Sequence, residues 1–330
     1  MNILVTGGAG FIGSVVAAQL LAEGHENVVV FDDLSKGNRC AVPQGAALVL
    51  GNVGDRAALD SVFEKHKVDA VMHFAAFIEA GESMEIPERY FRNNTANALA
   101  LLECMLAHRV RRLIFSSTAA LYGDPDRIPI LESDALRPTS AYGESKLLVE
   151  QMLEWFYRAH GLSYVSLRYF NAAGATEEQG ETHKPETHLI PTVLQVASGI
   201  REEVAIFGTD YETADGTCVR DYVHVSDLER AHLLALSALA EEPVPRQFVF
   251  NLGNDRGFSV LDVIETARKV TGHDIPTLMT KRRRGDPATL IASSEKIRRE
   301  LGWRPKIPEL EDIVRSAWEW HQRHPAGYED

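Results

Sequence analysis

The sequence has few cysteines, no long apolar run and little positive charge, and each shortage excludes a class of protein. Among its 330 residues only Cys40, Cys104 and Cys218 are cysteine. That usage excludes a disulfide scaffold and a cysteine-based metal site, so no metal is predicted, and it fits a reducing cytoplasm. No apolar stretch approaches the roughly 20 residues of a membrane span. The first expected strand begins at Asn2, so no signal peptide is expected either.

Positive charge is scarce, since 34 Lys and Arg residues stand against 47 Asp and Glu, for a formal net charge of -13. Neither nucleic acid nor an acidic membrane is attracted to such a surface, so neither is expected as a partner. A content of 45% hydrophobic and 25% charged residues is typical of one large or two closely associated globular domains. No internal repeat or low-complexity segment is present. We expect a cytoplasmic enzyme or binding protein.

A glycine-rich turn, TGGAGFIG at 6–13, stands between the apolar run 3–5 and a helical pattern. Glycines 8, 10 and 13 match the dinucleotide fingerprint, and glycines 7, 10 and 13 satisfy a wider spacing. Without Cβ atoms, such a turn lets a pyrophosphate approach the positive end of a helix. The apolar run 28–31 then ends in Asp32, at the distance of roughly 20 residues expected for a ribose-binding acid. An ordinary tight turn is the alternative.

Strand-like and helix-like patterns alternate along the first half of the chain. We expect strands at 47–50, 70–74, 113–116 and 164–169, and helices at 14–23, 55–66, 87–108 and 140–160. This alternation predicts the α/β class with a doubly wound parallel Rossmann sheet.

The polar, aperiodic stretch 171–188 marks the exit from this first domain. A smaller α/β substrate-binding lobe is expected after it, with helices at 189–198 and 260–270, a strand at 204–207 and a polar hairpin around 210–217. The segments 222–225 and 226–239 are interpreted as a return to the first domain. We therefore expect a dinucleotide-binding domain at 1–170 plus about 222–248, and the lobe at 171–221 plus about 249–330.

Tyr142 and Lys146 lie four residues apart on a predicted helix, so their side chains face the same way. A tyrosine that acts as a base at neutral pH needs its pKa lowered from near 10 by roughly 3, about 4 kcal/mol. A positive charge about 4 Å away supplies roughly that much. We therefore expect Lys146 to lower the pKa of Tyr142 and to grip the ribose of a nicotinamide cofactor. A surface tyrosine beside a solvated lysine is the alternative.

The hydroxyl cluster Ser116-Ser117-Thr118 follows an apolar strand. Ligands bind at the carboxyl ends of parallel strands, so a hydroxyl here can reach a substrate. A serine cluster that merely caps backbone groups is the alternative. The order of glycine turn, acidic strand end, hydroxyl cluster and Tyr-x-x-x-Lys favours the functional interpretation.

These motifs resemble the extended short-chain dehydrogenase/reductase family, and the resemblance covers nearly the whole chain. It is carried by VTGGAGFIG at 5–13, FDDLSKGNR at 31–39, HFAAFIEAGES at 73–83, SSTAALYG at 116–123, AYGESK at 141–146, RYFNAAGA at 168–175, AIFGTDYETADGTCVRDYVHV at 205–225 and RRRGDP at 282–287. Within the family, the resemblance is to the members that reversibly invert C4 of UDP-galactose and UDP-glucose through a 4-keto intermediate, with transient reduction of tightly bound NAD.

The resemblance implies residues for catalysis, for the cofactor and for the substrate. The implied catalytic residues are Thr118, Tyr142 and Lys146. The implied NAD site comprises Gly7, Gly10, Phe11, Ile12, Gly13, Asp32, Asp33, Leu34, Ser35, Lys36, Gly37, Asn52, Val53, Phe74, Ala75, Ala76, Ile78, Asn93, Ser116, Tyr142, Lys146 and Phe170. The implied UDP-sugar site comprises Thr118, Tyr142, Asn171, His188, Leu189, Ala205, Phe207, Arg220, Arg283 and Asp286.

Two of these assignments also make physical sense on their own. Asp32 can accept from both ribose hydroxyls and would repel a 2′-phosphate, so NAD is favoured over NADP. Arg220 and Arg283 suit a diphosphate, because guanidinium groups bind phosphate oxygens in pairs. A solvated basic face is the alternative for part of the run 281–284.

The chain departs from its relatives at several positions. Thr118 replaces a common serine and preserves the hydroxyl. Asn52 replaces an aspartate, Ile78 replaces a lysine of some relatives, and His188 replaces an asparagine of others. Leu290 aligns with a position where tyrosine excludes N-acetylated sugars, and leucine leaves that specificity open.

Other functions are weighed against this one. A nucleotide-sugar 4,6-dehydratase would carry an Asp-Glu pair after the strand-end hydroxyl, where this chain has Ala119-Ala120. Epimerases acting on UDP-N-acetylglucosamine, UDP-glucuronate or UDP-pentoses would use the same catalytic residues and stay open. A non-catalytic NAD-binding protein is disfavoured, because the catalytic set is intact.

The resemblance also implies a homodimer formed by the two long helices. Apolar candidates for its interface are Leu99, Leu102, Leu148 and Met152, which could equally belong to the core.

Overall fold

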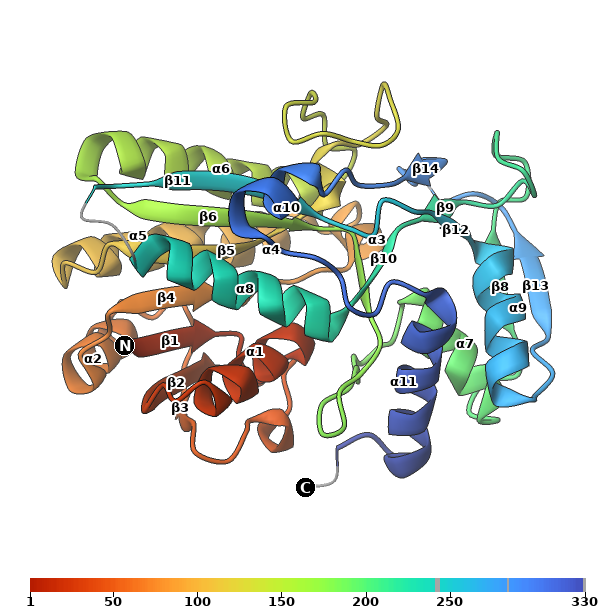
Figure 1. Ribbon diagram of the computed structural model, residues 1–330, viewed down its shortest axis with the longest axis horizontal. Coiled ribbons are helices and arrows are strands. Elements are labelled where there is room, and N and C mark those ends of the chain that lie inside the picture. Colours follow the sequence, from red (N-terminus) through yellow and green to blue (C-terminus); the bar gives the residue numbers. More distant parts are fainter. Residues whose placement is uncertain (241–243, 284, 329–330) are drawn as a thin grey trace.

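The computed structural model describes residues 1–240, 244–283 and 285–328 (Figure 1). Within these residues the main feature is a seven-stranded parallel sheet in the order β11-β6-β5-β4-β1-β2-β3. Its strands are β1 (Asn2–Thr6), β2 (Asn27–Asp32), β3 (Ala47–Leu50), β4 (Ala70–His73), β5 (Arg112–Thr118), β6 (Ser163–Tyr169) and β11 (Gln247–Leu252). The predicted doubly wound parallel sheet is confirmed.

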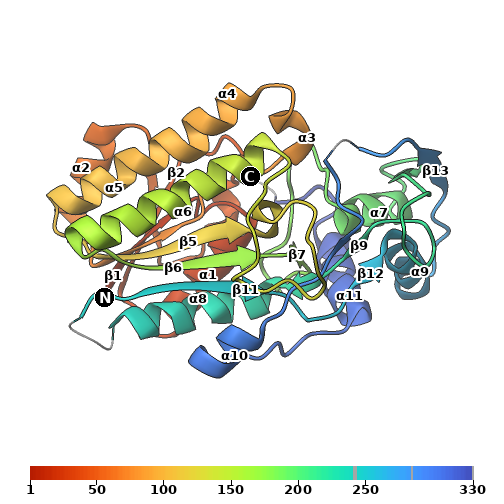
Figure 2. The same ribbon diagram turned by 90° about the horizontal axis from the view of Figure 1, so that it is seen from above.

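Helices cover both faces of the sheet (Figure 2). One face packs against α1 (Phe11–Ala22) and α8 (Val225–Ala240), and the other against α2 (Arg56–His66), α5 (Asn97–Ala107) and α6 (Ala141–His160). Side chains alternate between the faces, so Ile3 and Val5 join one hydrophobic cluster and Leu4 joins the other. Burial on both faces explains why β1 is apolar without a polar alternation.

The predicted helix at 87–108 is continuous but irregular. It consists of α4 (Pro87–Tyr90), a π-helical stretch (Phe91–Ala96) and α5, and the short helix α3 (Ala80–Ser83) precedes it. The buried Asn94 lies within the π-helical stretch. Its side chain exchanges two hydrogen bonds of 2.9 Å with the backbone of Phe77 and donates another, of 3.0 Å, to the Ser145 hydroxyl. This part of the helix is thereby tied to the loop after β4 and to α6.

The remaining elements form a lobe beyond the carboxyl ends of the sheet strands, at the right of Figure 1. Its helices α7 (Leu189–Ala197), α9 (Val260–Thr271) and α11 (Leu310–Arg323) share one hydrophobic cluster. Short strands pair around them: β7 (Asn171–Ala173) with β10 (Tyr222–His224), β8 (Val204–Phe207) with β13 (Thr277–Thr280), and β9 (Val219–Arg220) with β12 (Phe258–Ser259) and β14 (Thr289–Leu290). The helix α10 (Glu295–Leu301) packs against β11.

The predicted hairpin around 210–217 is wrong, because this segment is a loop without strands. The Asp215 carboxylate accepts hydrogen bonds of 2.8 Å from both the amide and the hydroxyl of Thr217. The Tyr211 amide donates to the Gly216 carbonyl at 2.9 Å. These local bonds use the groups that a strand pair would need.

Two features concern the predicted domain division and membrane insertion. The division at about residue 248 stays a prediction, and β11 carries the sheet on to Leu252.

Within residues 1–240, 244–283 and 285–328, none of the helices combines the length and the apolar character that a bilayer crossing requires.

Candidate active site

The glycine turn joins the end of β1 to the start of α1 at the carboxyl edge of the sheet. Gly7 has a φ of +72°, and a Cβ there would lie 2.5 Å from the Ala75 amide nitrogen. A Cβ on Gly13 would lie 2.4 Å from the Gly7 carbonyl oxygen. Gly10 is the N-cap of α1 and provides no side-chain cap, so the first amide groups of the helix are open to a ligand. This turn fits a pyrophosphate.

The Asp32 carboxylate ends β2 beside this turn. Its oxygens accept hydrogen bonds from the Ala9 amide at 3.0 Å and the Leu34 amide at 2.9 Å. Burial raises the pKa of Asp32, although the two amide donors oppose the rise. A carboxylate has about four acceptor sites. Acceptor capacity therefore remains for the hydroxyls of a ribose.

One cleft runs from the glycine turn along the ends of the strands into the lobe. Every residue of the predicted NAD site lines it except Leu34, whose amide holds Asp32 instead. The departures Asn52 and Ile78 both line the cleft. The Asn52 amide group donates to Asp33 at 2.7 Å, so this asparagine orders the acidic strand end.

The start of α6 positions Tyr142 against the end of β5. Ser140 caps the helix by accepting from the Gly143 amide at 3.1 Å. The Tyr142 amide donates to the Ser83 hydroxyl, also at 3.1 Å. Burial raises the pKa of Tyr142, a hydrogen bond from the Thr118 side chain opposes the rise, and the Glu79 carboxylate adds to it. Thr118 and Tyr142 are thus brought together as predicted.

Lys146 lies in the same cleft but is directed at the backbone of β5. Its ammonium group donates to the Ser116 carbonyl at 2.8 Å and lies 4.9 Å from the centroid of the Phe115 ring. Burial lowers the pKa of Lys146 to about 7, and the Glu150 carboxylate opposes this shift. The predicted lowering of the Tyr142 pKa by Lys146 is therefore wrong for the protein alone, because burial weakens the positive charge that it requires.

The predicted UDP-sugar residues fall into two groups. Thr118, Tyr142, Asn171, His188 and Leu189 line the cleft, whereas Ala205, Phe207, Arg220, Arg283 and Asp286 lie outside its lining.

The second group gathers on β8, β9 and the loop that follows β13. The Arg283 guanidinium lies 4.7 Å from the centroid of the Phe207 ring and donates to Asp286 at 3.0 Å. Thr139, just before α6, donates to the Gly285 carbonyl at 3.1 Å. This contact brings the basic loop to the start of the helix that carries Tyr142.

Leu290 lies on β14, opposite Arg220 of β9. It is buried in a cluster with Ala119, Tyr122 and Phe170, and Phe170 lines the cleft. No acidic side chain stands at 119 or 120 to support a dehydration.

Sequence reasoning missed several residues of this site. Ser83 and Glu79 act on Tyr142, and both belong to the motif at 73–83, in which only residues of the segment 74–78 were assigned a role. Glu181 and His183 also line the cleft. Their signal was the sequence ETHKPETH, which places two glutamates and two histidines within eight residues.

Comparison with known proteins decides the family. The model of the family described as "NAD dependent epimerase/dehydratase family" matches residues 3–253. The chain belongs to this family.

Members of the NAD dependent epimerase/dehydratase family match the chain along its whole length. It is 53% identical to a UDP-glucose 4-epimerase of Halalkalibacterium halodurans over 99% of this chain and 98% of that protein. A crystal structure of a UDP-glucose 4-epimerase matches with a TM-score of 0.95 and 49% identity over 100% of both chains. The Bifidobacterium longum UDP-glucose 4-epimerase, in complex with NAD+ and UDP, matches with a TM-score of 0.95 and 37% identity over 99% of this chain and 100% of that one. The resemblance drawn from the motifs is confirmed.

Proposed function

We propose that this protein reversibly interconverts UDP-galactose and UDP-glucose by inverting C4 of the sugar, with NAD as a cofactor that stays bound. The observation that carries the proposal is the meeting of Thr118, Tyr142 and Lys146 in the cleft that begins at the glycine turn. Likeness to UDP-glucose 4-epimerases over the full chain supports it.

The residues of the cleft fit NAD. The turn at 7–13 would hold the pyrophosphate, and Asp32 would accept from the hydroxyls of the adenosine ribose. When bound, NAD supplies a reversible hydride acceptor for C4 of the sugar, together with a positive charge near Tyr142 and Lys146. The rest of the predicted NAD site is proposed from its place along the same cleft.

The chain's own groups handle the proton. Tyr142 would take the proton of the 4-hydroxyl and later return it, and Thr118 would hold that hydroxyl within reach. Lys146 would bind ribose hydroxyls of the nicotinamide half and, when charged, favour the phenolate of Tyr142. The Ser83 bond to the Tyr142 amide orients the first turn of α6.

We further propose that Arg220 and Arg283 bind the diphosphate of the substrate, since a protein of net charge -13 needs local cations for an anionic ligand. Asn171, His188, Leu189, Ala205, Phe207 and Asp286 would complete the UDP-sugar site. Leu290 belongs to the same hydrophobic cluster as Phe170 and is smaller than a tyrosine, which favours UDP-N-acetylglucosamine as a second candidate substrate.

We also propose a cytoplasmic homodimer. Of the predicted interface residues, Leu99 on α5 is 38% exposed, whereas Leu102 is buried in the core. Trp155 on α6 is 66% exposed and would extend an apolar interface. Leu102 is therefore withdrawn from the interface.

The test is incubation of the purified protein, without added NAD, with UDP-galactose, UDP-N-acetylgalactosamine, UDP-glucuronate and UDP-arabinose, followed by separation of the products. Conversion of UDP-galactose to UDP-glucose is expected, with NAD released on denaturation. Turnover of another sugar alone would replace the substrate assignment, and turnover of none would reject the function.

A further inference from the structure

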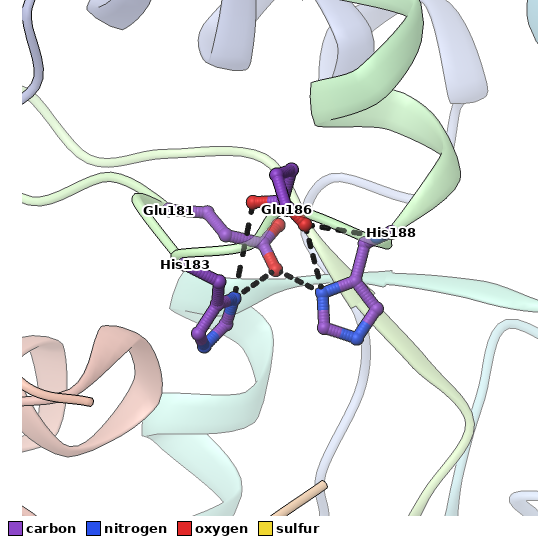
Figure 3. A group of neighbouring side chains, drawn as sticks. All are labelled: Glu181, His183, Glu186 and His188. Carbon is purple, nitrogen blue, oxygen red and sulfur yellow. Dashed lines mark hydrogen bonds and ion pairs between the residues drawn. The ribbon is translucent and has the colours of Figure 1, made fainter. Parts of the chain in front are cut away.

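Four side chains of one short segment face one another at the wall of the cleft. Glu181, His183, Glu186 and His188 offer ligand-type atoms that all lie within 4.8 Å of one another. Figure 3 shows both imidazole rings with one nitrogen directed at the two carboxylates. Glu181, His183 and His188 line the cleft, and His188 belongs to the proposed UDP-sugar site, but none of the three proposed catalytic residues is in this group.

The distances between the facing atoms suit a small cation. Glu181 Oε1 lies 3.0 Å from His183 Nδ1 and 2.5 Å from His188 Nδ1. Oxygens of Glu186 lie 3.9 Å and 3.5 Å from the same two nitrogens. Around a tetrahedral ion with ligands at about 2.0–2.1 Å, neighbouring ligand atoms are roughly 3.3 Å apart. The observed distances bracket that value, so small side-chain adjustments would place all four atoms on one ion.

The negative charge and the burial of the two glutamates also favour a bound cation. The side chains of Glu181 and Glu186 are only 5% and 2% exposed. Two carboxylates out of water are unfavourable unless positive charge compensates them. The Nδ1 atom of His188 is buried and faces both carboxylates, although the side chain as a whole is 43% exposed.

The group is held in place by its surroundings. Glu186 Oε1 accepts from the amides of Thr187 and His188, both at 2.8 Å, which fixes the direction of its carboxylate. The Arg201 guanidinium donates to the Glu186 backbone carbonyl at 2.9 Å. His321 of α11 lines a small cavity together with Glu181. Such outer contacts orient the ligands of metal sites.

We propose that Glu181, His183, Glu186 and His188 bind one divalent transition-metal ion, and that the ion fixes the loop before α7 against the cleft. Two imidazole nitrogens and two carboxylate oxygens suit zinc, whereas magnesium and calcium favour oxygen ligands alone. The ion would neutralise both carboxylates and leave Nε2 of His188 free toward the cleft. Its role is in holding the wall of the site, because no catalytic side chain is among its ligands.

The test measures zinc binding directly. Full-length protein is treated with a chelator, dialysed against Zn²⁺, and its metal content is determined by elemental analysis. One zinc per chain is expected. In His183→Gln, whose side chain is 18% exposed in the parent, the affinity should fall by more than the roughly 10–100-fold that loss of an outer contact costs.

A second group of possible ligands provides the matched control. The ligand-type atoms of Asp60, Cys104 and His108 also lie within 4.8 Å of one another. His108→Gln should bind zinc like the parent. Binding that is lost in His108→Gln and kept in His183→Gln would overturn the proposal, as would less than one zinc per chain at saturation in the parent.

A measurement on the parent protein guards against a variant that fails to fold. X-ray absorption at the zinc edge should show nitrogen and oxygen ligands without sulfur. A sulfur ligand would place the ion at a cysteine, such as Cys104, and reject the site at 181–188. Circular dichroism of both variants checks that their folds are intact.

Discussion

The Lys146 ammonium group donates a 2.8 Å hydrogen bond to the Ser116 carbonyl oxygen. This bond joins α6 to the end of β5, the two elements that carry Tyr142 and Thr118. We expect the separation of the Thr118 and Tyr142 hydroxyls to depend on this bond. Lys146 is only 3% exposed, so its proton is weakly held.

Stability without bound nucleotide should rise with pH because of Lys146. Its pKa is about 7 in the folded protein, against 10.5 ordinarily. Between these values the unfolded chain binds a proton that the folded chain lacks, so the free energy of unfolding increases with pH. The increase should amount to a few kcal/mol, at about 1.4 kcal/mol for each pKa unit. Urea unfolding at pH 7 and pH 9 should show this increase in the parent and not in Lys146→Met. An equal change in the free energy of unfolding between the two pH values in both proteins would contradict the assignment.

Tyr142→Phe should lower kcat by at least the roughly 100-fold that general acid-base catalysis contributes. The change removes the phenol that would carry the 4-hydroxyl proton and keeps the ring. Tyr157→Phe, the same change on the same helix, should turn over UDP-galactose like the parent. Product separation after fixed times measures both. Near-normal turnover of Tyr142→Phe would remove the residue from its role.

Gly10→Ala should fold but retain NAD poorly. An added Cβ would meet the Gly7 carbonyl oxygen at 3.3 Å, which the turn can absorb, yet it would occupy space toward the pyrophosphate. A loss of at least about tenfold in affinity, or 1.4 kcal/mol, is expected. Gly81→Ala, where nothing lies within 4 Å of the added Cβ, is the control. Fluorescence titration with NAD compares the two, and equal affinities would count against the turn as cofactor site.

Arg168→Met should destabilise the fold by roughly 3–5 kcal/mol, because it leaves the buried Glu150 carboxylate unpaired. The parent pair is held at 3.0 Å and 2.6 Å by two parallel bonds. Arg158→Met breaks the pair with Glu154, also 2.6 Å but with the arginine 61% exposed, and should cost less than about 1 kcal/mol. Thermal unfolding compares them. Similar losses in both variants would mean that burial does not set the cost.

Arg283→Gln should raise KM for the UDP-sugar by roughly 10–100-fold, the worth of a charged hydrogen bond, and leave kcat nearly unchanged. The proposed contact with the diphosphate would be the same in the ground and transition states, because the diphosphate does not react. Arg282→Gln is the control, since Arg282 is the neighbouring arginine, is bound by Asp210 and the Tyr211 ring, and is not among the residues proposed for the UDP-sugar site. Initial rates at varied UDP-galactose decide, and a KM change in the control alone would exchange the two roles.

The sheet and the cofactor end of the cleft were predictable because their signals are local. An apolar run, a glycine turn and an acidic strand end follow one another within 33 residues of sequence, and strand alternation then sets the topology. The hairpin around 210–217 failed because Asp215 and Thr217 bond to each other. The π-helical stretch was missed because it is associated with contacts of Asn94 to distant residues.

The sequence predicted which residues form the site better than it predicted their pKa values. A four-residue spacing on a helix places Tyr142 and Lys146 on one face, but says nothing of how deeply each is buried. Burial raises the pKa of Tyr142 and lowers that of Lys146, so it favours the neutral form of both side chains. The expectation was a charged lysine beside a tyrosine of lowered pKa. Glu181 and His183 were missed although the segment ETHKPETH at 181–188 places them beside Glu186 and His188 in sequence as well as in space.

The position of β11 at the sheet edge bears on how the chain is made. Strand β1 lies inside the sheet, and the outermost partner of β6 is added only by residues 247–252. A growing polypeptide therefore completes α7 and β8 while β6 still presents an unpaired edge of backbone donors and acceptors. Shortened products that stop between Tyr169 and Arg246 should be prone to aggregation or capture by chaperones, since the edge of β6 is closed only when residues 247–252 have been added.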